Sequence, residues 1–436
     1  MTTTAEQVYR RLVDDDEDHG CGDLPESACR EVPGSALKLV AALTLQKIGD
    51  RIVDPKTVLA WLFTSIGAPT GLTGLLVPIR ESGSLLPQAT LVPVVRRFAR
   101  RKWVWVVGAA GMAAAVAVMA VLAVSATGAT AAWGILAALA VFALARSLSS
   151  ISSKDVLGRT VPKGQRGQVT GLSTVTSGLV AITVGVGIRL WGGQGSDPVF
   201  FALLLAGAAL LWLGAGAVFA TVREPAGDHD ASLDVGSIAS ALSLLADDAP
   251  FRRFVVARTL LLVSALAPPF IVTLATTQGD AGLSGLGLFI IAQGAASLVG
   301  GRAWGRLADR SSRRVIIVAA GLATATIVVF LVAIASETVA SFAPVYPVAY
   351  FILAVIHTGS RIGRKTYVVD FAQGDQRTSY VAVSNTAMGV LLLVTGAASA
   401  ALATIGARWA LGFLALLGAL AVPVGRTLTE VSADPS

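Results

Sequence analysis

The hydrophobic positions of this chain form long continuous runs and do not follow the spacing of an amphipathic helix or strand. Examples are VWVVGAAGMAAAVAVMAVLAVSA, FALLLAGAALLWLGAGAVFATV and VIIVAAGLATATIVVFLVAIAS. A helix of about 20 residues, rising about 1.5 Å per residue, crosses the roughly 30 Å hydrocarbon core of a bilayer. The recurrence of such runs predicts an all-α integral membrane protein and argues against a large soluble one.

Polar residues divide these runs into about twelve predicted membrane-spanning helices. The first six are expected at 38–64, 69–94, 103–126, 130–152, 168–190 and 198–221. The second six are expected at 254–277, 282–304, 314–335, 340–361, 379–403 and 406–426. The sequence therefore predicts two six-helix domains, 38–221 and 254–426, joined by a polar loop at 222–253 and flanked by tails at 1–37 and 427–436.

The basic residues of the predicted loops lie almost entirely on one side of the membrane. They occur in RRFARRK, between Lys154 and Arg166, in GRLADRSSRR and between Arg361 and Arg377, whereas the other side has little more than Arg189 and Arg408. Cytoplasmic loops carry an excess of Lys and Arg, so both termini are expected in the cytoplasm of a multi-pass protein of the cytoplasmic (inner) membrane. This placement also explains the net charge of +7 without a nucleic-acid partner.

The amino-terminal tail is polar and acidic, with the run DDDED and no apolar segment typical of a signal peptide. It is expected to be a disordered or peripheral cytoplasmic segment. Cys21 and Cys29, with only His19 nearby, are too few for a metal site, and we expect them to be reduced thiols. The sequence predicts no metal and no cofactor.

One segment in each half has a counterpart in the other. KDVLGRTVPKGQRGQVTGLSTVTSG begins at Lys154, and KTYVVDFAQGDQRTSYVAVSNTAMG begins at Lys365. Aligning these lysines also pairs Arg166 with Arg377, at the same separation of 211 residues. Parallel repeats of this kind are a known transporter architecture.

The loop GRLADRSSRR carries a resemblance to a known family. Its residues Gly305, Asp309, Arg310, Arg313 and Arg314 resemble the loop between the second and third helices of a six-helix half in the major facilitator superfamily. The resemblance extends over nearly the whole chain after residue 37. It implies two six-helix bundles that rock about a central site in alternating access, with the acidic residue of this loop joining a charge relay on the cytoplasmic side.

The chain also departs from the family pattern. In the first half the matching loop reads VPVVRRFARR, with Val92 and Arg96 where glycine and aspartate are expected. The fifth span lacks the Gly-Pro element that drug–proton antiporters of the family usually show, which weakens a multidrug-export interpretation. At the cytoplasmic mouth we expect interdomain salt bridges, although a positive-inside role alone explains the cations. The candidates are Lys154, Arg166, Lys365, Asp370, Asp375 and Arg377.

The first predicted span contains the charged stretch LQKIGDRIVDPK. Lys47, Asp50, Arg51 and Asp54 lie on one stripe of a helix, about 14 to 24 Å from its start and close to the middle of the bilayer. Lys47 can reach Asp50, and Arg51 can reach Asp54, before Pro55 interrupts the helix. Ionisable residues at this depth are functional candidates by default.

The second span brings Arg80 and Glu81 to a similar depth, so the formal charge of the combined cluster is zero. In one interpretation the cluster binds a polar solute or a proton: Glu81 and Asp50 carry the proton, and Arg80 binds an anionic group. In the other, it is a salt-bridge network that only fixes two helices. If the first span instead began near Thr57, the stripe would lie in the cytoplasm, but too few residues would then remain for the second crossing.

Two further ionisable residues fall within predicted spans. Arg146 begins the hydroxyl-rich stretch RSLSSISS that ends the fourth span, and His357 occupies the matching place in the tenth. Each either faces the central cavity or extends to the inner interface.

Three functions compete on these observations. The first is a secondary transporter that moves a small polar or charged solute by alternating access, coupled to protons, as a monomer without an ATPase subunit. The second is a non-transporting sensor or assembly factor of the same architecture. The third, the membrane half of an ATP-driven transporter or a membrane enzyme, is disfavoured because the chain has no G-x-x-x-x-G-K-[ST], H-E-x-x-H or G-x-S-x-G motif.

Overall fold

The structure, a computed structural model, describes residues 7, 9, 29–162, 165–191, 197–226, 245–278, 283–371 and 376–431. Every regular element within these ranges is a helix. Nine helical segments are long and apolar enough to cross a membrane. They are α8 (Lys102–Ser125), α9 (Gly128–Thr160), α10 (Arg166–Trp191), α11 (Pro198–Ala220), the interrupted α13 (Ala249–Leu260), α14 (Val263–Leu266) and α15 (Pro268–Gln278), α17 (Ser312–Ala333), α19 (Val345–Phe371), α20 (Gln376–Ala403) and α21 (Ala407–Arg426).

Three further predicted spans complete the two halves, and the first two of them are interrupted. The first consists of α3 (Val32–Ile52) and α4 (Val58–Ser65), and the second of α5 (Thr70–Thr73), α6 (Leu76–Leu85) and α7 (Gln88–Arg96). The eighth is α16 (Leu283–Arg310), which contains the apolar stretch Gly285–Gly300. The fold class expected from the sequence, an all-helical membrane protein built from two six-helix halves, is confirmed.

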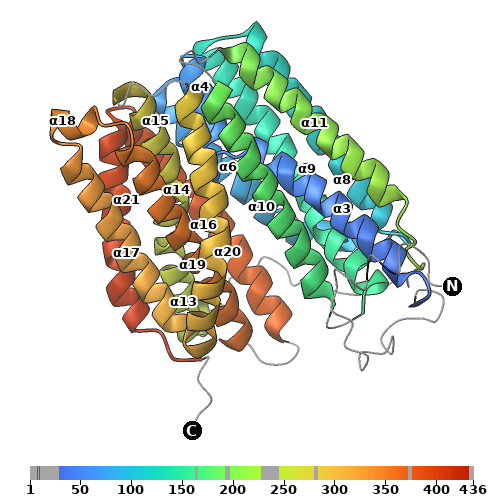
Figure 1. Ribbon diagram of the computed structural model, residues 1–436. Helices are drawn as coiled ribbons and strands as arrows, with labels where there is room; N and C mark the ends of the chain where they lie inside the picture. Colours follow the sequence, from blue (N-terminus) through green and yellow to red (C-terminus); the bar gives the residue numbers. More distant parts are fainter. Residues whose placement is uncertain are drawn as a thin grey trace.

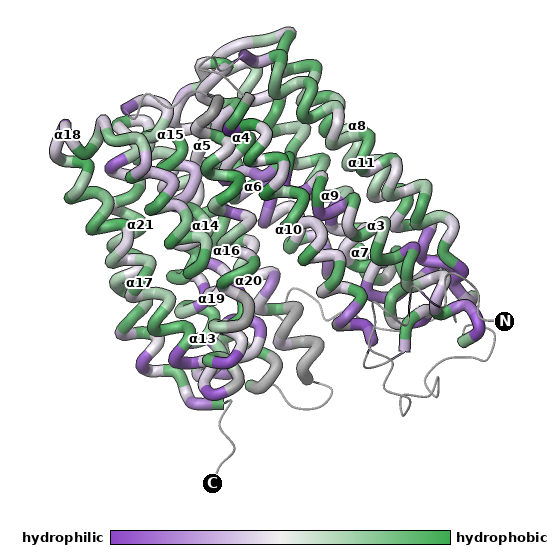
Figure 2. Tube along the Cα trace, in the orientation of Figure 1, coloured by the Kyte–Doolittle hydropathy of each residue, from purple (hydrophilic) through white to green (hydrophobic). Residues whose placement is uncertain are grey.

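The helices form two bundles, with α3–α11 in one and α13–α21 in the other (Figure 1). Their outer faces are apolar, and polar residues concentrate near the chain ends and between the bundles (Figure 2). Leu203 and Val329 on these faces are 69% and 67% exposed, as expected for side chains that contact lipid. Both ends of the chain lie on one side of the bundles, here called the terminal side (Figure 1).

The bundles pack tightly against each other on the side opposite the termini, here called the closed side. A Cβ added to Gly287 of α16 would lie 2.5 Å from the carbonyl oxygen of Gly185 on α10. A Cβ added to Gly396 of α20 would lie 2.0 Å from Pro78 Cγ on α6. Small residues at both crossings let the helix backbones approach closely, which is how membrane helices commonly pack.

Buried aromatic side chains reinforce the closed side. Trp61 of α4 packs edge-on against Phe289 of α16 at a ring-centroid distance of 5.7 Å, and Phe289 packs edge-on against Tyr350 of α19 at 5.2 Å. All three side chains are at most 1% exposed. The Tyr350 hydroxyl donates to Gln293 Oε1 at 2.8 Å, so its polar end is satisfied. These rings join the two bundles beyond the charged part of the first span.

The interruption of the first span follows from its sequence. Pro55 has no backbone N–H and cannot continue α3. Asp54 Oδ1 accepts a hydrogen bond from the backbone N–H of Lys56 at 2.7 Å, and the chain then re-enters a helix at Val58. Broken helices within a membrane are tolerated where they are buried in protein or line a polar cavity.

The two halves repeat one terminal-side contact in detail. Glu224, just after α11, accepts the backbone N–H groups of Arg101 and Lys102 at 3.1 and 2.8 Å, at the start of α8. Glu430, just after α21, accepts the hydroxyl of Ser311 at the start of α17. In each half, therefore, an acidic residue after the sixth span holds the beginning of the third. This supports the internal repeat expected from the sequence.

The amino-terminal region differs from expectation in two ways. Helix α3 begins at Val32, earlier than the predicted start at residue 38, because Val32-Pro33 provides a good helical first turn. Cys29 is disulfide-bonded, so the expectation of reduced thiols is wrong. Most of the acidic tail, residues 227–244 of the central loop and residues 432–436 lie outside the described residues.

We expect Gly287→Ala to lower the free energy of unfolding by about 1–3 kcal/mol, because its methyl group would overlap the α10 backbone and push the helices apart. Unfolding of the purified protein by SDS titration measures this change. Gly412→Ala on α21 is the matched control, since nothing lies within 4 Å of a Cβ there. Equal stability of the two variants would contradict the tight crossing.

Candidate functional site

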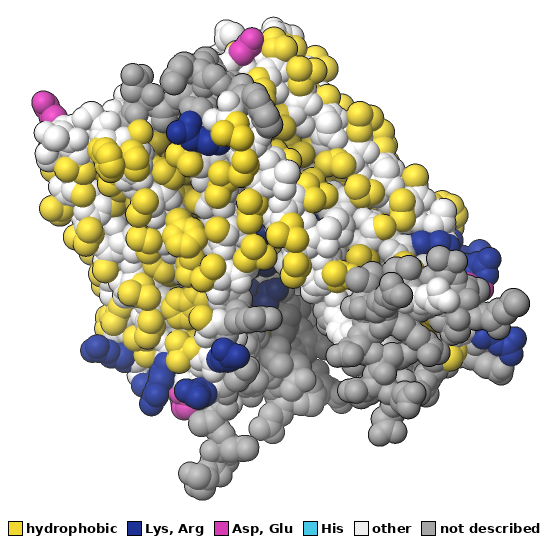
Figure 3. Space-filling view, viewed as in Figure 1, with side chains coloured by type: hydrophobic (Ala, Val, Ile, Leu, Met, Phe, Trp, Pro, Cys, Tyr) yellow, Lys and Arg dark blue, Asp and Glu magenta, His cyan; other side chains and the backbone are white. Residues whose placement is uncertain are grey.

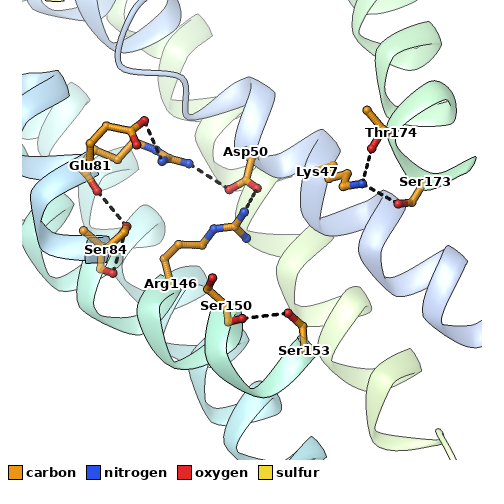
Figure 4. A network of polar contacts seen from close by, with 11 residues as sticks. Lys47, Asp50, Glu81, Ser84, Arg146, Ser150, Ser153, Ser173 and Thr174 are labelled. Carbon is orange, nitrogen blue, oxygen red and sulfur yellow. Dashed lines mark hydrogen bonds and ion pairs between the residues drawn. The ribbon is translucent and has the colours of Figure 1, made fainter. Parts of the chain in front are cut away.

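Asp50, in the last turn of α3, is the centre of a buried ion-pair network (Figure 4). Its Oδ2 lies 2.7 Å from Arg146 Nη2 on α9, and its Oδ1 lies 3.3 Å from Arg80 Nη2 on α6. The three side chains are 14%, 24% and 13% exposed, respectively. One carboxylate thus connects three helices of the first bundle. Arg146 belongs to this network, so the alternative in which it extends to the interface is wrong.

Arg80 has a second carboxylate neighbour and an aromatic one. Its Nη1 lies 3.7 Å from Glu81 Oε1, and its Cζ lies 5.6 Å from the centre of the Phe142 ring. Arg80 Nε has no described hydrogen-bond partner although it is buried. Glu81 is 38% exposed, far more than Asp50, and its ion pair is longer. Glu81 is therefore the more accessible carboxylate of the cluster.

Lys47 and Arg51 point away from their own helix. Lys47 Nζ donates to the hydroxyls of Ser173 and Thr174 on α10, each at 2.6 Å, as Figure 4 shows. Arg51 Nη2 donates to Ser297 Oγ at 2.9 Å on α16 of the other bundle. Among the described ion pairs, Lys47 does not pair with Asp50 and Arg51 does not pair with Asp54, so the pairing expected along the stripe is wrong. Hydroxyl groups on facing helices take that place.

The sequence analysis did not select Lys56, although it ends the charged stretch. Lys56 is 7% exposed, and its Nζ lies 3.1 Å from His357 Nε2 on α19. His357 Nδ1 lies 3.1 Å from Ser264 Oγ on α14, so His357 lies inside the protein and not at the interface. The break at Pro55 turns Lys56 toward the other bundle, which a continuous helix would not have done.

The second bundle adds more positive charge opposite Glu81. Arg361 and Arg364 of α19, with Lys56 and Arg80, are the cations that interact electrostatically with this carboxylate. The formal charge of zero expected from the sequence did not include Lys56, Arg361 or Arg364. Among the described residues, the assembled centre is instead rich in positive charge.

The residues of the GRLADRSSRR loop lie at the terminal-side ends of α16 and α17. Arg313 Nη2 donates to the carbonyl oxygen of Arg426 at 2.7 Å, and the Arg314 backbone N–H donates to Ser311 Oγ at 3.1 Å. Arg310 is exposed, and a Cβ at Gly305 would meet nothing within 4 Å. The side chain of Asp309 lies outside the described structure, so its role in a charge relay stays a prediction.

The expected salt bridges of the cytoplasmic mouth are not formed by the described side chains. Arg166 donates to two backbone carbonyls at the end of α9, at 2.8 and 2.6 Å. Lys154 and Lys365 are exposed and repel each other electrostatically across the two bundles. The side chains of Asp370 and Arg377 and the whole of Asp375 lie outside the described residues.

The first half has its own terminal-side ion pair, which the sequence analysis missed. Arg101 Nη1 lies 2.7 Å from Asp155 Oδ2, near the end of α9. Burial raises the pKa of nearby Glu224, and the backbone N–H groups of Lys102 and Arg101 oppose that shift. This ion pair joins the start of α8 to the terminal-side end of α9. No group of three or more possible metal ligands occurs within the described residues.

Residues 55–356 match the family model of the Major Facilitator Superfamily. No curated protein sequence matches the chain. The match covers more than half of the sequence and includes the loop at Gly305 that carries the resemblance.

Solved transporter structures have the same fold. The xylose transporter XylE from E. coli, in an inward open conformation, has a TM-score of 0.66 and 10% identity over 90% of this chain and 96% of its own. A POT family transporter in complex with a thioalcohol conjugated peptide has a TM-score of 0.69 and 9% identity over 93% of this chain and 97% of its own. A mutant of the nucleoside transporter NupG has a TM-score of 0.66 and 12% identity over 90% of this chain and 98% of its own. The family match and these neighbours indicate a membrane transporter and not an enzyme.

We expect Asp50→Asn to destabilise the protein by about 3–5 kcal/mol, because two largely buried guanidinium groups lose their shared carboxylate. SDS titration of the purified protein measures the change. Asp197→Asn is the control, since this residue caps α11 through its side chain and asparagine caps equally well.

The double variant Asp50→Asn/Arg146→Gln should lose less stability than the sum of its single variants, because it removes a cation together with its partner. A loss below about 1 kcal/mol for Asp50→Asn, typical of an exposed pair, would contradict a buried network.

Proposed function

This chain belongs to the Major Facilitator Superfamily, and we propose that it moves a small polar or charged solute by alternating access, coupled to protons. We place it as a monomer in the cytoplasmic membrane with both termini in the cytoplasm, in agreement with the basic loops on the terminal side. The observation that carries the proposal is the polar cluster between the bundles, which includes a partly exposed carboxylate, Glu81, among cations of both bundles.

The arrangement of the bundles supports the alternating-access part of the proposal. The helix crossings and aromatic contacts described above join them on the closed side. On the terminal side, Figure 3 shows a hollow between them with Lys or Arg side chains on its wall. We therefore assign this structure to a state open toward the cytoplasm, in which the cluster is reached from that side.

The two candidate carboxylates, Asp50 and Glu81, make different contacts and therefore suit different roles. Asp50 is held by two guanidinium groups at 2.7 and 3.3 Å and is largely buried, which suits a structural centre. Glu81 is more exposed and has one longer contact, at 3.7 Å. It faces Arg80, Lys56, Arg361 and Arg364, whose positions depend on how the bundles are placed. A rearrangement of the bundles therefore changes the proton affinity of Glu81, which is the requirement for coupling.

We expect solute-dependent proton movement in liposomes that contain the purified protein and an internal pH dye. The solutes are pools of organic acids, amino acids, sugars and cationic drugs. Glu81→Gln should abolish the pH change because the side chain can no longer exchange a proton. Glu337→Gln is the matched control, because Glu337 lies on the short helix α18 (Glu337–Ala340), away from the cluster, and should behave like the parent.

Three outcomes decide between the proposals. Loss of the pH change in Glu81→Gln alone supports proton coupling through this residue. Solute movement without a pH change in parent and variant alike contradicts coupling but leaves transport intact. No movement of any solute would favour a non-transporting sensor or assembly factor of the same fold.

A further inference from the structure

Two arginines are buried in the second bundle, and among the described side chains neither forms an ion pair with a carboxylate. Arg258 of α13 is 8% exposed, and Arg364 of α19 is 7% exposed. Arg258 donates to Ser384 Oγ at 2.7 Å and Asn385 Oδ1 at 2.8 Å on α20. Both guanidinium groups also contact the sulfur of Met388, at 3.1 Å from Arg258 Nε and 3.4 Å from Arg364 Nη1. These partners are neutral, and a thioether is a weak acceptor.

The second bundle has no acidic residue that could neutralise this pair from within the membrane. Between residues 249 and 426 the acidic residues are Asp280, Asp309, Glu337, Asp370 and Asp375. Asp309, Glu337 and Asp370 lie within two residues of a helix end, and Asp280 and Asp375 lie outside the described residues. A buried cation without a counter-charge is costly, and replacement by apolar side chains would commonly be neutral or stabilising. Retention of this charge therefore points to a use for it.

Arg364 and its neighbour Arg361 have donors without a described hydrogen-bond partner. Arg364 uses its Nε for the carbonyl of Ser360 and its Nη1 for Met388, whereas its Nη2 donates to no described protein group. Arg361, one turn earlier on α19, is exposed and has no described hydrogen bond. Both interact electrostatically with Glu81 of the first bundle, so they face the space between the bundles and not the lipid.

We infer that Arg361 and Arg364, with Arg258 behind them, bind the anionic group of the transported solute, a carboxylate or a phosphate. The planar fork of an arginine fits both groups, and two adjacent forks supply the charge-assisted hydrogen bonds that hold them. The inference rests on the proposed function for its site, and it extends that function by naming the solute class and by assigning recognition to the second bundle.

In the empty protein the Glu81 carboxylate interacts with both arginines, so it competes with the solute for them. When the anion binds, Glu81 loses part of its positive surroundings and takes up a proton from the open side. The cluster gains one negative charge from the solute group and one positive charge from the proton, so its total charge is unchanged. Anion and proton are then bound together and cross together.

The test measures thermal unfolding of the purified full chain with succinate, inorganic phosphate or the neutral diamide of succinate at millimolar concentrations. A ligand that binds only the folded state raises the unfolding temperature. Succinate or phosphate should stabilise the parent, and the diamide should not. The anion affinity should fall at least tenfold in Arg361→Gln and Arg364→Gln, and it should not change in Arg253→Gln, an exposed arginine of α13.

Arg361 is exposed, so its variant tests the inference even if Arg364→Gln does not fold. In Glu81→Gln the anions should bind more tightly than in the parent, by about tenfold, because the competing carboxylate is gone. Stabilisation by succinate but not phosphate identifies a carboxylate site, and the reverse identifies a phosphate site. Equal effects of succinate and its diamide, or full anion affinity in both arginine variants, would overturn the inference.

The outcomes are distinguishable from failure of the proposed function. Proton-coupled uptake of neutral solutes, with no anion binding, would overturn the anion site and leave the transporter in place. Anion binding at these arginines without movement of any solute in liposomes would keep the site and overturn transport.

Discussion

The structure depends on the scarcity of negative charge inside a medium that does not tolerate unpaired ions. The membrane-embedded centre contains three carboxylates, Asp50, Asp54 and Glu81, and more cations than these can neutralise. Asp50 is committed to Arg80 and Arg146, so it fixes α3, α6 and α9 as one unit. Asp54 is used at the helix break, where it accepts the Lys56 N–H. Of the two carboxylates with described ion pairs in this centre, Glu81 has the longer contact and the more exposed side chain, and it interacts with cations of both bundles. Bundle motion therefore changes the environment of Glu81 more than that of Asp50.

The scarcity of negative charge also determines how the two bundles contact each other. On the closed side, backbones approach through glycines and aromatic rings and need no charge. Nearer the centre, contacts between the bundles are single hydrogen bonds, as between Arg51 and Ser297 or Lys56 and His357. Such bonds stabilise one arrangement modestly and can be exchanged for others when the helices shift. Rigid bundles with exchangeable polar contacts between them are what alternating access requires.

The sequence was sufficient to predict the spans, the two halves and the depth of the charged stretch, because apolar length and loop charge are local properties of the chain. It placed Asp50, Arg80 and Glu81 in a common region and left Arg146 open between the cavity and the interface, and the structure brings all four together. The sequence could not predict the hydrogen-bond partners of the other charged side chains. Lys47 bonds to α10 and Arg51 to α16 because the direction of a side chain depends on which helices face it. Lys56 was missed because a proline break, and not helical periodicity, sets its orientation.

Arg258 and Arg364 show where such a prediction reaches its limit. In the sequence each is one arginine near the cytoplasmic end of a span, where a positive-inside role is a sufficient explanation. Only the packing of α13, α19 and α20 shows that both are buried together on neutral partners. A cation that served only to orient the chain would extend to the headgroups, where hydration is available. These two lie instead inside the bundle and, through Arg364, face a carboxylate on the opposite bundle. Their burial is therefore explained by a negative charge that comes and goes, and not by the topology of the membrane.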